Sequence, residues 1–189
     1  MFVTLALTTE EIQTRNARIE SLLATISCGD TASMGLLYDL IKTDIFAYAL
    51  SKTGNKDDAD DITQDTFVQI YKNAKQYTPK GKPMAWIITI ETNLINRQFQ
   101  LRSRTTALDE SFENTSSGED IEERIINNTF LVQILKTLNE EERQVITLHI
   151  VSGMKHREIA KVLGKPLSTV LSKYNRAIKK LQLVAKEVL

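Results

Sequence analysis

Apolar residues recur every three or four positions along most of the chain, which is the spacing of one face of an amphipathic α-helix. In the first half this spacing predicts a long helical stretch broken at Gly29-Asp30, and a turn at Gly54-Asn55 separates that stretch from two further helices. Two prolines and a glycine predict a loop over residues 77–83. The predicted helical ranges are 15–49, 57–75 and 86–101.

The second half of the chain predicts further helices. Residues 121–138 carry the helical period, and Asn139 followed by Glu142 resembles a capping sequence that opens the next helix. Near the carboxyl end, Gly164-Lys165-Pro166 interrupts what would otherwise be one long helix. Because glycine can adopt the left-handed conformation that ends a helix and proline fits the first turn of the next, a tight corner between two helices is predicted.

The two helices at this corner have the features of a helix-turn-helix. Ile159, Ala160 and Leu163 give the first a narrow inward face, and the second, over about 167–183, has opposite apolar and polar faces. Hydrogen-bonding side chains near its start and cations further along suit the base edges and phosphates of duplex DNA. The alternative is a surface helical hairpin whose lysines are simply solvated. The predicted apolar stripe is Val170, Leu171, Tyr174, Ala177, Ile178 and Leu181, and the polar face is Ser168, Thr169, Ser172, Lys173, Arg176 and Lys180.

Composition agrees with an all-α fold. The 189 residues include only 7 glycines and 3 prolines, which argues against a turn-rich β fold, and 42% are apolar, which is enough to build cores. Residues 105–118 have no sustained periodicity, are acidic and end in a Ser-Ser-Gly run, which indicates a linker. We therefore expect two small helical domains joined by a flexible acidic linker.

Charge is strongly segregated along the chain although the net charge is zero. Residues 1–70 hold eleven acidic and five basic residues, whereas 71–104 hold seven basic residues against Glu91. The pattern repeats, because 105–142 hold ten acidic and two basic residues and 143–189 hold ten basic and two acidic ones. Two separate basic segments, each preceded by an acidic one, suit a protein that grips a polyanion at two places.

Several classes of site are excluded by their missing residues. The acidic run at 57–65 lacks the alternating oxygens and central glycine of a calcium loop, and neither His149 nor His156 has the preceding glutamate of a di-iron site. No nucleophile motif or glycine-rich phosphate loop occurs, so we expect no metal, no cofactor and no catalytic activity. The acidic run is then either a charged helix start or a docking surface for a basic partner.

The location follows from cysteine usage and hydropathy. Cys28 is the single cysteine, which fits a reducing compartment, and we expect it to be a small buried side chain. The apolar opening MFVTLAL is short and lacks a basic flank, so neither a signal peptide nor a membrane span is expected. We predict a cytoplasmic protein with no membrane insertion of its own.

A candidate site for single-stranded DNA lies in the first basic segment. Trp86 follows Lys80 and Lys82, and the next helix sets amides and cations along one face. An aromatic ring, amides and cations together permit base stacking, edge hydrogen bonds and phosphate neutralisation. The alternative for Trp86 is a core side chain at the start of an apolar helix.

Three of these segments, in order, resemble the extracytoplasmic-function (group IV) sigma factors of bacterial RNA polymerase. DDADDITQDTFVQIYKN resembles the family's helix that docks on the polymerase β′ clamp, and PMAWIITIETNL resembles its Trp-led helix that reads a flipped-out base of the melted minus-ten element. The segment from Leu138 to Leu181 resembles the helix-turn-helix that reads the duplex minus-thirty-five element. The resemblance covers residues 23–183.

The resemblance assigns three sets of residues. It implies polymerase docking by Asp58, Asp61, Gln64, Asp65, Thr66 and Phe67. It implies minus-ten contacts by Lys80, Lys82, Trp86, Asn93, Asn96, Arg97, Arg102 and Arg104. It implies minus-thirty-five contacts by Lys165, Ser168, Thr169, Ser172, Lys173, Arg176 and Lys180.

The resemblance also implies a domain division and a function. Residues 1–20 would be an amino-terminal extension, 21–104 sigma region 2, 105–120 the acidic linker and 121–189 sigma region 4. The expected partners are core RNA polymerase through its β′ clamp and β flap, promoter DNA and an anti-sigma factor. The alternative function is a stand-alone helix-turn-helix regulator that binds duplex DNA without polymerase.

Overall fold

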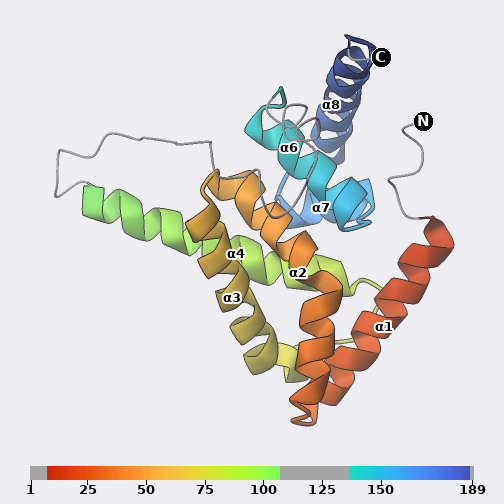
Figure 1. Cartoon of the computed structure of the whole chain (residues 1–189), viewed down its shortest axis with the longest axis vertical. Helices are drawn as coiled ribbons and strands as arrows, with labels where there is room; N and C mark the ends of the chain where they lie inside the picture. Colours follow the sequence, from red (N-terminus) through yellow and green to blue (C-terminus); the bar gives the residue numbers. More distant parts are fainter. Residues whose placement is uncertain (1–7, 107–136, 188–189) are drawn as a thin grey trace.

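The computed structural model describes residues 8–106 and 137–187, and these residues form helices joined by short turns (Figure 1). No strand occurs within these two ranges, so the all-α class predicted from the sequence is confirmed. The bounds are α1 Thr9–Ser27, α2 Ala32–Thr53, α3 Lys56–Asn73, the 3-10 turn η1 Ala74–Gln76, α4 Pro83–Thr106, α6 Glu140–Ile146, the π-helical turn η2 Thr147–Val151, α7 His156–Val162 and α8 Leu167–Glu187.

Helix α1 begins earlier than the sequence pattern predicts. Thr8 and Glu11 form a reciprocal capping box at its start, and Ile19 and Leu23 are buried against the following helices. The helix therefore runs across the boundary expected at residue 20, and residues 9–20 belong to the bundle. Cys28 caps the carboxyl end of α1 and is exposed, so the expectation of a buried cysteine is wrong.

The amino-terminal bundle is built around α2. Its inward face packs on α1, α3 and α4, and the ring of Tyr38 lies 4.8 Å from that of Phe67 on α3. The predicted turn at Gly54-Asn55 is present: Gly54, at φ +65°, ends α2 in the left-handed conformation, and the Asn55 side chain caps α3. The shared core of this bundle consists of Ile19, Leu23, Leu37, Ile41, Ile45, Tyr48, Ala59, Ile70, Ile87, Ile88 and Ile95.

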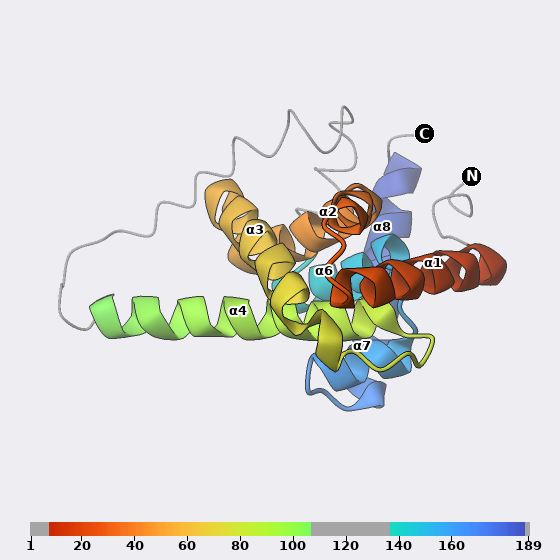
Figure 2. The same ribbon diagram turned by 90° about the horizontal axis from the view of Figure 1, so that it is seen from below.

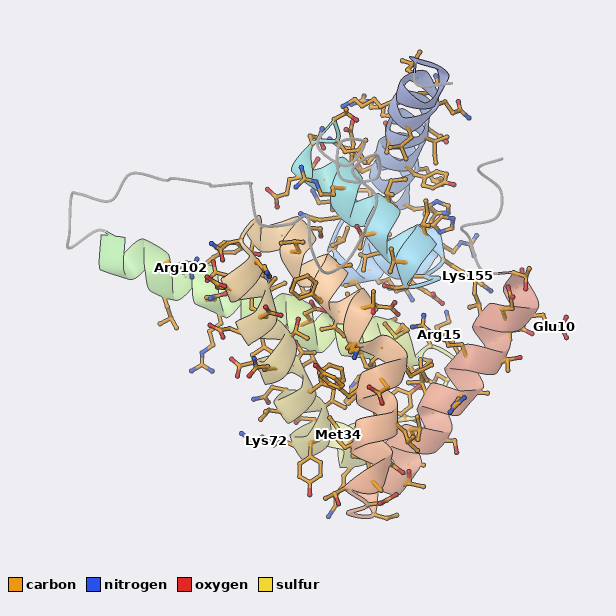
Figure 3. The ribbon with its side chains drawn as sticks, in the orientation of Figure 1. Glu10, Arg15, Met34, Lys72, Arg102 and Lys155 are labelled. Carbon is orange, nitrogen blue, oxygen red and sulfur yellow. The ribbon has the colours of Figure 1, made fainter. Side chains whose placement is uncertain are left out.

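Helix α4 has 24 residues and follows the predicted loop at 77–83, which contains Lys80 and Lys82 and is called the basic loop below. Its amino-terminal half lies across the bundle, while its carboxyl-terminal half extends beyond α3 (Figure 2). Arg102 on this extension binds the carboxylate of Asp58 at the start of α3 through both terminal nitrogens (Figure 3). That bidentate pair links the extended end of α4 to the start of α3.

The carboxyl-terminal helices form the predicted corner. Asn139 and Glu142 make the expected capping box at the start of α6. Gly164 takes φ +62° after α7, and the N–H of Lys165 donates to the Ala160 carbonyl at 2.9 Å. Those contacts form a Schellman motif, which ends α7 and allows α8 to start at Leu167 in a new direction.

The two groups of helices pack directly against each other, which the sequence did not predict. Helix α2 contacts η2 and α6, and α4 contacts α7, so that buried residues of both halves form one continuous apolar cluster. Two ion pairs cross this contact: Lys82 with Glu158 at 3.2 Å and Lys52 with Glu140 at 3.5 Å. Residues 105 and 106 of the predicted linker end α4, and the rest of that linker and most of the predicted helix at 121–138 lie outside the described residues.

No helix in the described ranges is both long enough and apolar enough to span a bilayer.

Two carboxyl groups are buried between α2 and α4. Asp44, which pairs with Arg15 of α1, is 5% exposed, and burial raises its pKa to about 6 despite the opposing effect of Arg15. Glu91 is fully buried, no side chain of the described residues donates a hydrogen bond to either of its oxygens, and burial raises its pKa well above the ordinary value. Burial therefore makes both groups bind a proton more readily in the folded state than in the unfolded chain.

Stability should consequently depend on pH with a defined sign. A carboxyl group whose pKa is raised on folding adds stability at low pH, and this contribution is lost as pH rises through the folded pKa. The free energy of unfolding should fall by about 3 kcal/mol because of Asp44 alone as the pH rises from about 4 to about 6. Glu91→Gln should flatten the pH dependence of the free energy of unfolding and raise that free energy at pH 7.5, as measured by denaturant titration.

The exposed residue Glu10 offers a matched control on α1. Glu10→Gln should leave the slope of stability against pH unchanged. An unchanged slope in Glu91→Gln would contradict the assignment of the pH dependence to the buried carboxyl.

Candidate functional site

The acidic face of α3 divides into exposed and buried residues. Asp61, Gln64 and Asp65 are exposed and, at spacings of three and four, lie on one side of the helix. Thr66 and Phe67 are buried, and the Thr66 hydroxyl donates to the carbonyl of Ile62 at 2.7 Å. The side chains of those two residues therefore pack in the core of this structure, and their role in polymerase docking stays a prediction.

Asp58 and Arg102 were predicted to serve different partners but bind each other. The two side chains lie 44 residues apart in the sequence and form two hydrogen bonds. Each charge is therefore already compensated in this structure. The side chain of Arg104, two residues further along α4, lies outside the described residues.

A hollow of about 420 Å³ lies between α3, η1 and α4. Trp86, Asn93 and Arg97 of the predicted minus-ten set line it, whereas Asn96 is exposed but is not among the lining residues. Trp86 is half-buried and packs on Tyr77 with ring centroids 5.1 Å apart, so its ring is both a packing element and a wall of the hollow. The remaining lining residues are Gln69, Asn73, Gln76, Thr89, Ile90 and Leu94.

Three of the lining residues outside the predicted set are amides of α3 and η1. Gln69, Asn73 and Gln76 recur at spacings of four and three on one side of the chain, which is a helical period that could have identified them. Together with Asn93 they give the hollow side-chain amides that can both donate and accept hydrogen bonds. The hollow is therefore suited to a planar, polar group such as a nucleobase, with an aromatic wall and a cation beside it.

The basic loop before α4 presents two exposed lysines. Lys80 and Lys82 are both exposed, and the Lys82 ammonium pairs with one oxygen of Glu158. The other oxygen of Glu158 accepts from the backbone N–H of Lys155 at 3.0 Å and so caps α7. The Glu158 carboxylate thus connects the basic loop of the amino-terminal bundle to the helix-turn-helix formed by α7 and α8.

The outward face of α8 differs from the predicted one by part of a turn. Ser168, Ser172 and Arg176 are exposed as predicted, and Thr169 is half-buried. Leu171 is 39% exposed, so its placement in the inward apolar stripe was wrong. The other members of that stripe are buried or half-buried, and the exposed face is completed by Asn175 and Lys179, which sequence reasoning missed.

Three of the predicted minus-thirty-five cations are bound to acids of α6. Lys165 and Lys173 both pair with Glu141, and Lys180 pairs with Glu142 at 2.7 Å. The hydrogen bonds from Lys165 and Lys173 lower the pKa of Glu141 to about 2, so the acid stays ionised at neutral pH. These lysines therefore brace α8 against α6, and their positive charge is largely compensated within the protein.

An aromatic cluster supports the same corner from inside. The rings of His149 and His156 stack at 4.3 Å, and both meet the ring of Tyr174 of α8 edge-on. Burial, and then the neighbouring His149, lower the pKa of His156. The packed rings connect η2, α7 and α8 and hold the outward face of α8 in a fixed orientation.

Two models of known protein families match this chain, one in each half. Residues 37–105 match the model of Sigma-70 region 2, and residues 131–181 match that of Sigma-70, region 4. Together the two matches cover more than half of the chain. The hollow and the acidic face of α3 lie within the first match, and α7 and most of α8 lie within the second.

Individual relatives are distant in sequence. The chain is 27% identical over 172 residues to the ECF RNA polymerase sigma factor BldN of Streptomyces coelicolor and 29% identical over 163 residues to SigE of Mycolicibacterium smegmatis. These alignments cover 88% and 82% of this chain but only 65% and 63% of the relatives, so the chain spans less than two thirds of their length.

One solved structure shares the fold. The sigma factor RpoE of Bartonella quintana, solved in complex with the anti-sigma factor NepR, superposes with a TM-score of 0.63 at 23% identity and covers 79% of this chain and 94% of that one. The chain belongs to the sigma-70 family. Within that family it is an extracytoplasmic-function sigma factor, as its two regions and its relatives indicate.

Proposed function

We propose that this protein is a dissociable specificity subunit that binds core RNA polymerase and directs promoter-specific initiation of transcription. The polymerase supplies the catalytic centre, and this chain supplies recognition of the minus-ten element as a melted strand and of the minus-thirty-five element as duplex. The observation that carries the proposal is the amide-lined hollow beside Trp86 on the same chain as the exposed polar face of α8.

Capture of an unpaired base accounts for the chemistry of the hollow. A base that leaves the duplex loses stacking and pairing, and it recovers part of both from an aromatic ring and from amides along its edge. Trp86 offers the ring, Asn93 and Gln69 offer amides, and Arg97 offers a cation for the adjoining phosphate. Promoter opening then follows from binding energy, without a chemical step.

Duplex recognition uses the outward face of α8. Ser168 and Ser172 can hydrogen-bond to base edges, and Arg176 can bind a guanine edge or a phosphate. The exposed Leu171 between them adds an apolar contact suited to a thymine methyl group. Since Lys165, Lys173 and Lys180 are paired within the protein, we expect Arg176 to contribute more to affinity than any of them.

The amino-terminal bundle and the carboxyl-terminal helices must separate before the minus-ten and minus-thirty-five elements are both bound. Elements about 25 base pairs apart lie about 85 Å apart along B-DNA, at 3.4 Å per base pair. While the Lys82–Glu158 pair holds the amino-terminal bundle against the carboxyl-terminal helices, the protein cannot reach the minus-ten and minus-thirty-five elements at once. The exposed acidic face of α3 would bind the polymerase β′ clamp, region 4 would meet the β flap, and an anti-sigma factor would keep the protein from polymerase.

Reconstitution distinguishes this function from a stand-alone regulator. The purified chain is mixed with core polymerase and a promoter fragment that is pre-melted at the minus-ten element. A stable complex and a specific transcript are expected. Tight duplex binding without polymerase, and no transcript with it, would instead support the stand-alone regulator.

The charge pairing on α8 yields a separate prediction. Arg176→Ala should weaken duplex binding by about 1–3 kcal/mol if Arg176 reads a base, or mainly flatten the salt dependence if it contacts phosphate. Lys173→Ala, a matched change one turn earlier, should have a smaller effect because Glu141 already compensates that charge. The measurement is duplex affinity of the holoenzyme over a range of salt concentrations, and equal losses in both variants would contradict the ranking.

A further inference from the structure

The loop that precedes α4 is held by one carboxylate of α1. The Oε1 atom of Glu20 accepts hydrogen bonds from the Tyr77 hydroxyl at 2.5 Å, the Lys80 N–H at 3.0 Å and the Gly81 N–H at 2.8 Å. We propose that Glu20 is a positioning residue for the minus-ten site, which holds the basic loop and Trp86 in the geometry that receives an unpaired base. This inference rests on the function proposed above.

The loop backbone is shaped to surround an anion. Lys80 and Gly81 direct successive N–H groups at the same oxygen, and Gly81 adopts φ +67°, a conformation that side chains with a Cβ rarely take. Successive N–H groups in such a turn form a concave anion-binding nest. Here the anion is a side chain of the protein itself, so the loop conformation is set before any DNA arrives.

The same carboxylate reaches the aromatic wall of the hollow through Tyr77. The Tyr77 ring packs on Trp86 at 5.1 Å, and its hydroxyl is held by Glu20. Burial, followed by the hydrogen bond to Glu20, raises the pKa of Tyr77, so the hydroxyl remains a donor at neutral pH. Fixing the Tyr77 ring limits the positions that the Trp86 ring can occupy.

Helix α1 is a firm support for this contact. Ile19 and Leu23 flank Glu20 and are 0% and 1% exposed, so the helix cannot rotate without unpacking its core face. Asn16, one turn before Glu20, donates to the Gly81 carbonyl at 3.2 Å. The basic loop runs beside α1 in the view from below (Figure 2), and the contacts of Asn16 and Glu20 with Gly81 join α1 to it.

The test measures loop geometry and strand binding in the full chain. Because Trp86 is the only tryptophan, its fluorescence reports on this loop directly. Glu20→Ala should shift the Trp86 emission and weaken binding of a pre-melted minus-ten promoter by the holoenzyme about tenfold, as expected for loss of charge-assisted hydrogen bonds. Affinity for an isolated minus-thirty-five duplex should not change.

Three further variants keep the result interpretable. Glu10→Ala removes the same charge from the outer end of the same helix (Figure 3) and should behave as the unaltered protein. Tyr77→Phe retains the ring and should lose less binding than Glu20→Ala. Glu20→Gln keeps an acceptor oxygen and should restore part of the loss, and together with Tyr77→Phe it carries the test if thermal denaturation shows that Glu20→Ala is unfolded.

The opposite outcomes overturn the inference. Unchanged strand binding in Glu20→Ala would remove the positioning role, and tighter binding would indicate that the nest is meant for a DNA phosphate that Glu20 excludes. If the unaltered holoenzyme failed to bind the pre-melted promoter, the proposed function itself would be rejected, and the role of Glu20 in it would be rejected too. Normal binding by the unaltered protein and by Glu20→Ala would reject Glu20 alone.

Discussion

Asp61→Lys is expected to abolish stable binding to core polymerase while leaving the fold intact. Asp61 is exposed beside Gln64 and Asp65, so lysine would present a cation to the basic partner surface that these acids are proposed to contact. Like charges facing each other cost several kcal/mol, and we expect about 2–4 kcal/mol, or roughly 30-fold to 1000-fold in affinity. In the free protein the cost should be small, because Asp61 is exposed and lies beyond the first turn of α3, where the helix dipole has little effect.

Competition with a labelled wild-type chain for core polymerase measures this loss. Asp60→Lys is the matched control, because Asp60 is exposed on the same helix but projects about 100° away. Binding of the variant to an isolated minus-thirty-five duplex should be unchanged. Equal weakening by the Asp60 and Asp61 substitutions would show that net charge matters and that this face of α3 is not a specific docking surface.

Asn93→Ala is expected to impair promoter opening without affecting polymerase binding. Asn93 is exposed and lines the hollow, so its removal should cost little folding stability but take away an amide from the captured base. Loss of such an edge contact should weaken binding of a melted minus-ten strand by about 1–3 kcal/mol, which is roughly 5-fold to 150-fold. Reactivity of unpaired thymines with permanganate would follow the opening.

A neighbouring amide provides the comparison for this prediction. Asn96 is exposed on the same helix but is not among the lining residues of the hollow. Asn96→Ala should therefore have a smaller effect on opening than Asn93→Ala. If the two substitutions impaired opening equally, the hollow would not be the site of base capture.

Features that depend on a few neighbouring residues were predictable. The capping box at Asn139, the turn at Gly54-Asn55 and the left-handed Gly164 are as the sequence predicts. Each of these depends on contacts within one or two helical turns. Family resemblance likewise depended on short motifs within single helices, and the matches to both sigma-70 regions confirm it.

The exposure of individual side chains was less predictable, because it depends on neighbouring helices. Thr66 and Phe67 fit the docking motif but are buried by the packing of α2 on α3. Leu171 fits an apolar period but lies at the edge of the contact face of α8, where no helix covers it fully. The helical period identifies a stripe, whereas the crossing angle of the neighbouring helix decides its edges.

The sequence by itself determined the all-α class, the capping box at Asn139, the corner before α8 and the family. Only the tertiary structure decided which charges are compensated: Lys165 meets Glu141 from 24 residues away, and Glu20 holds a loop 60 residues further along the chain. The packing of η2 and α6 on α2 was likewise decided only by the tertiary structure. Local periodicity follows from backbone geometry, but contacts between distant side chains arise only after apolar faces have packed and brought those residues together.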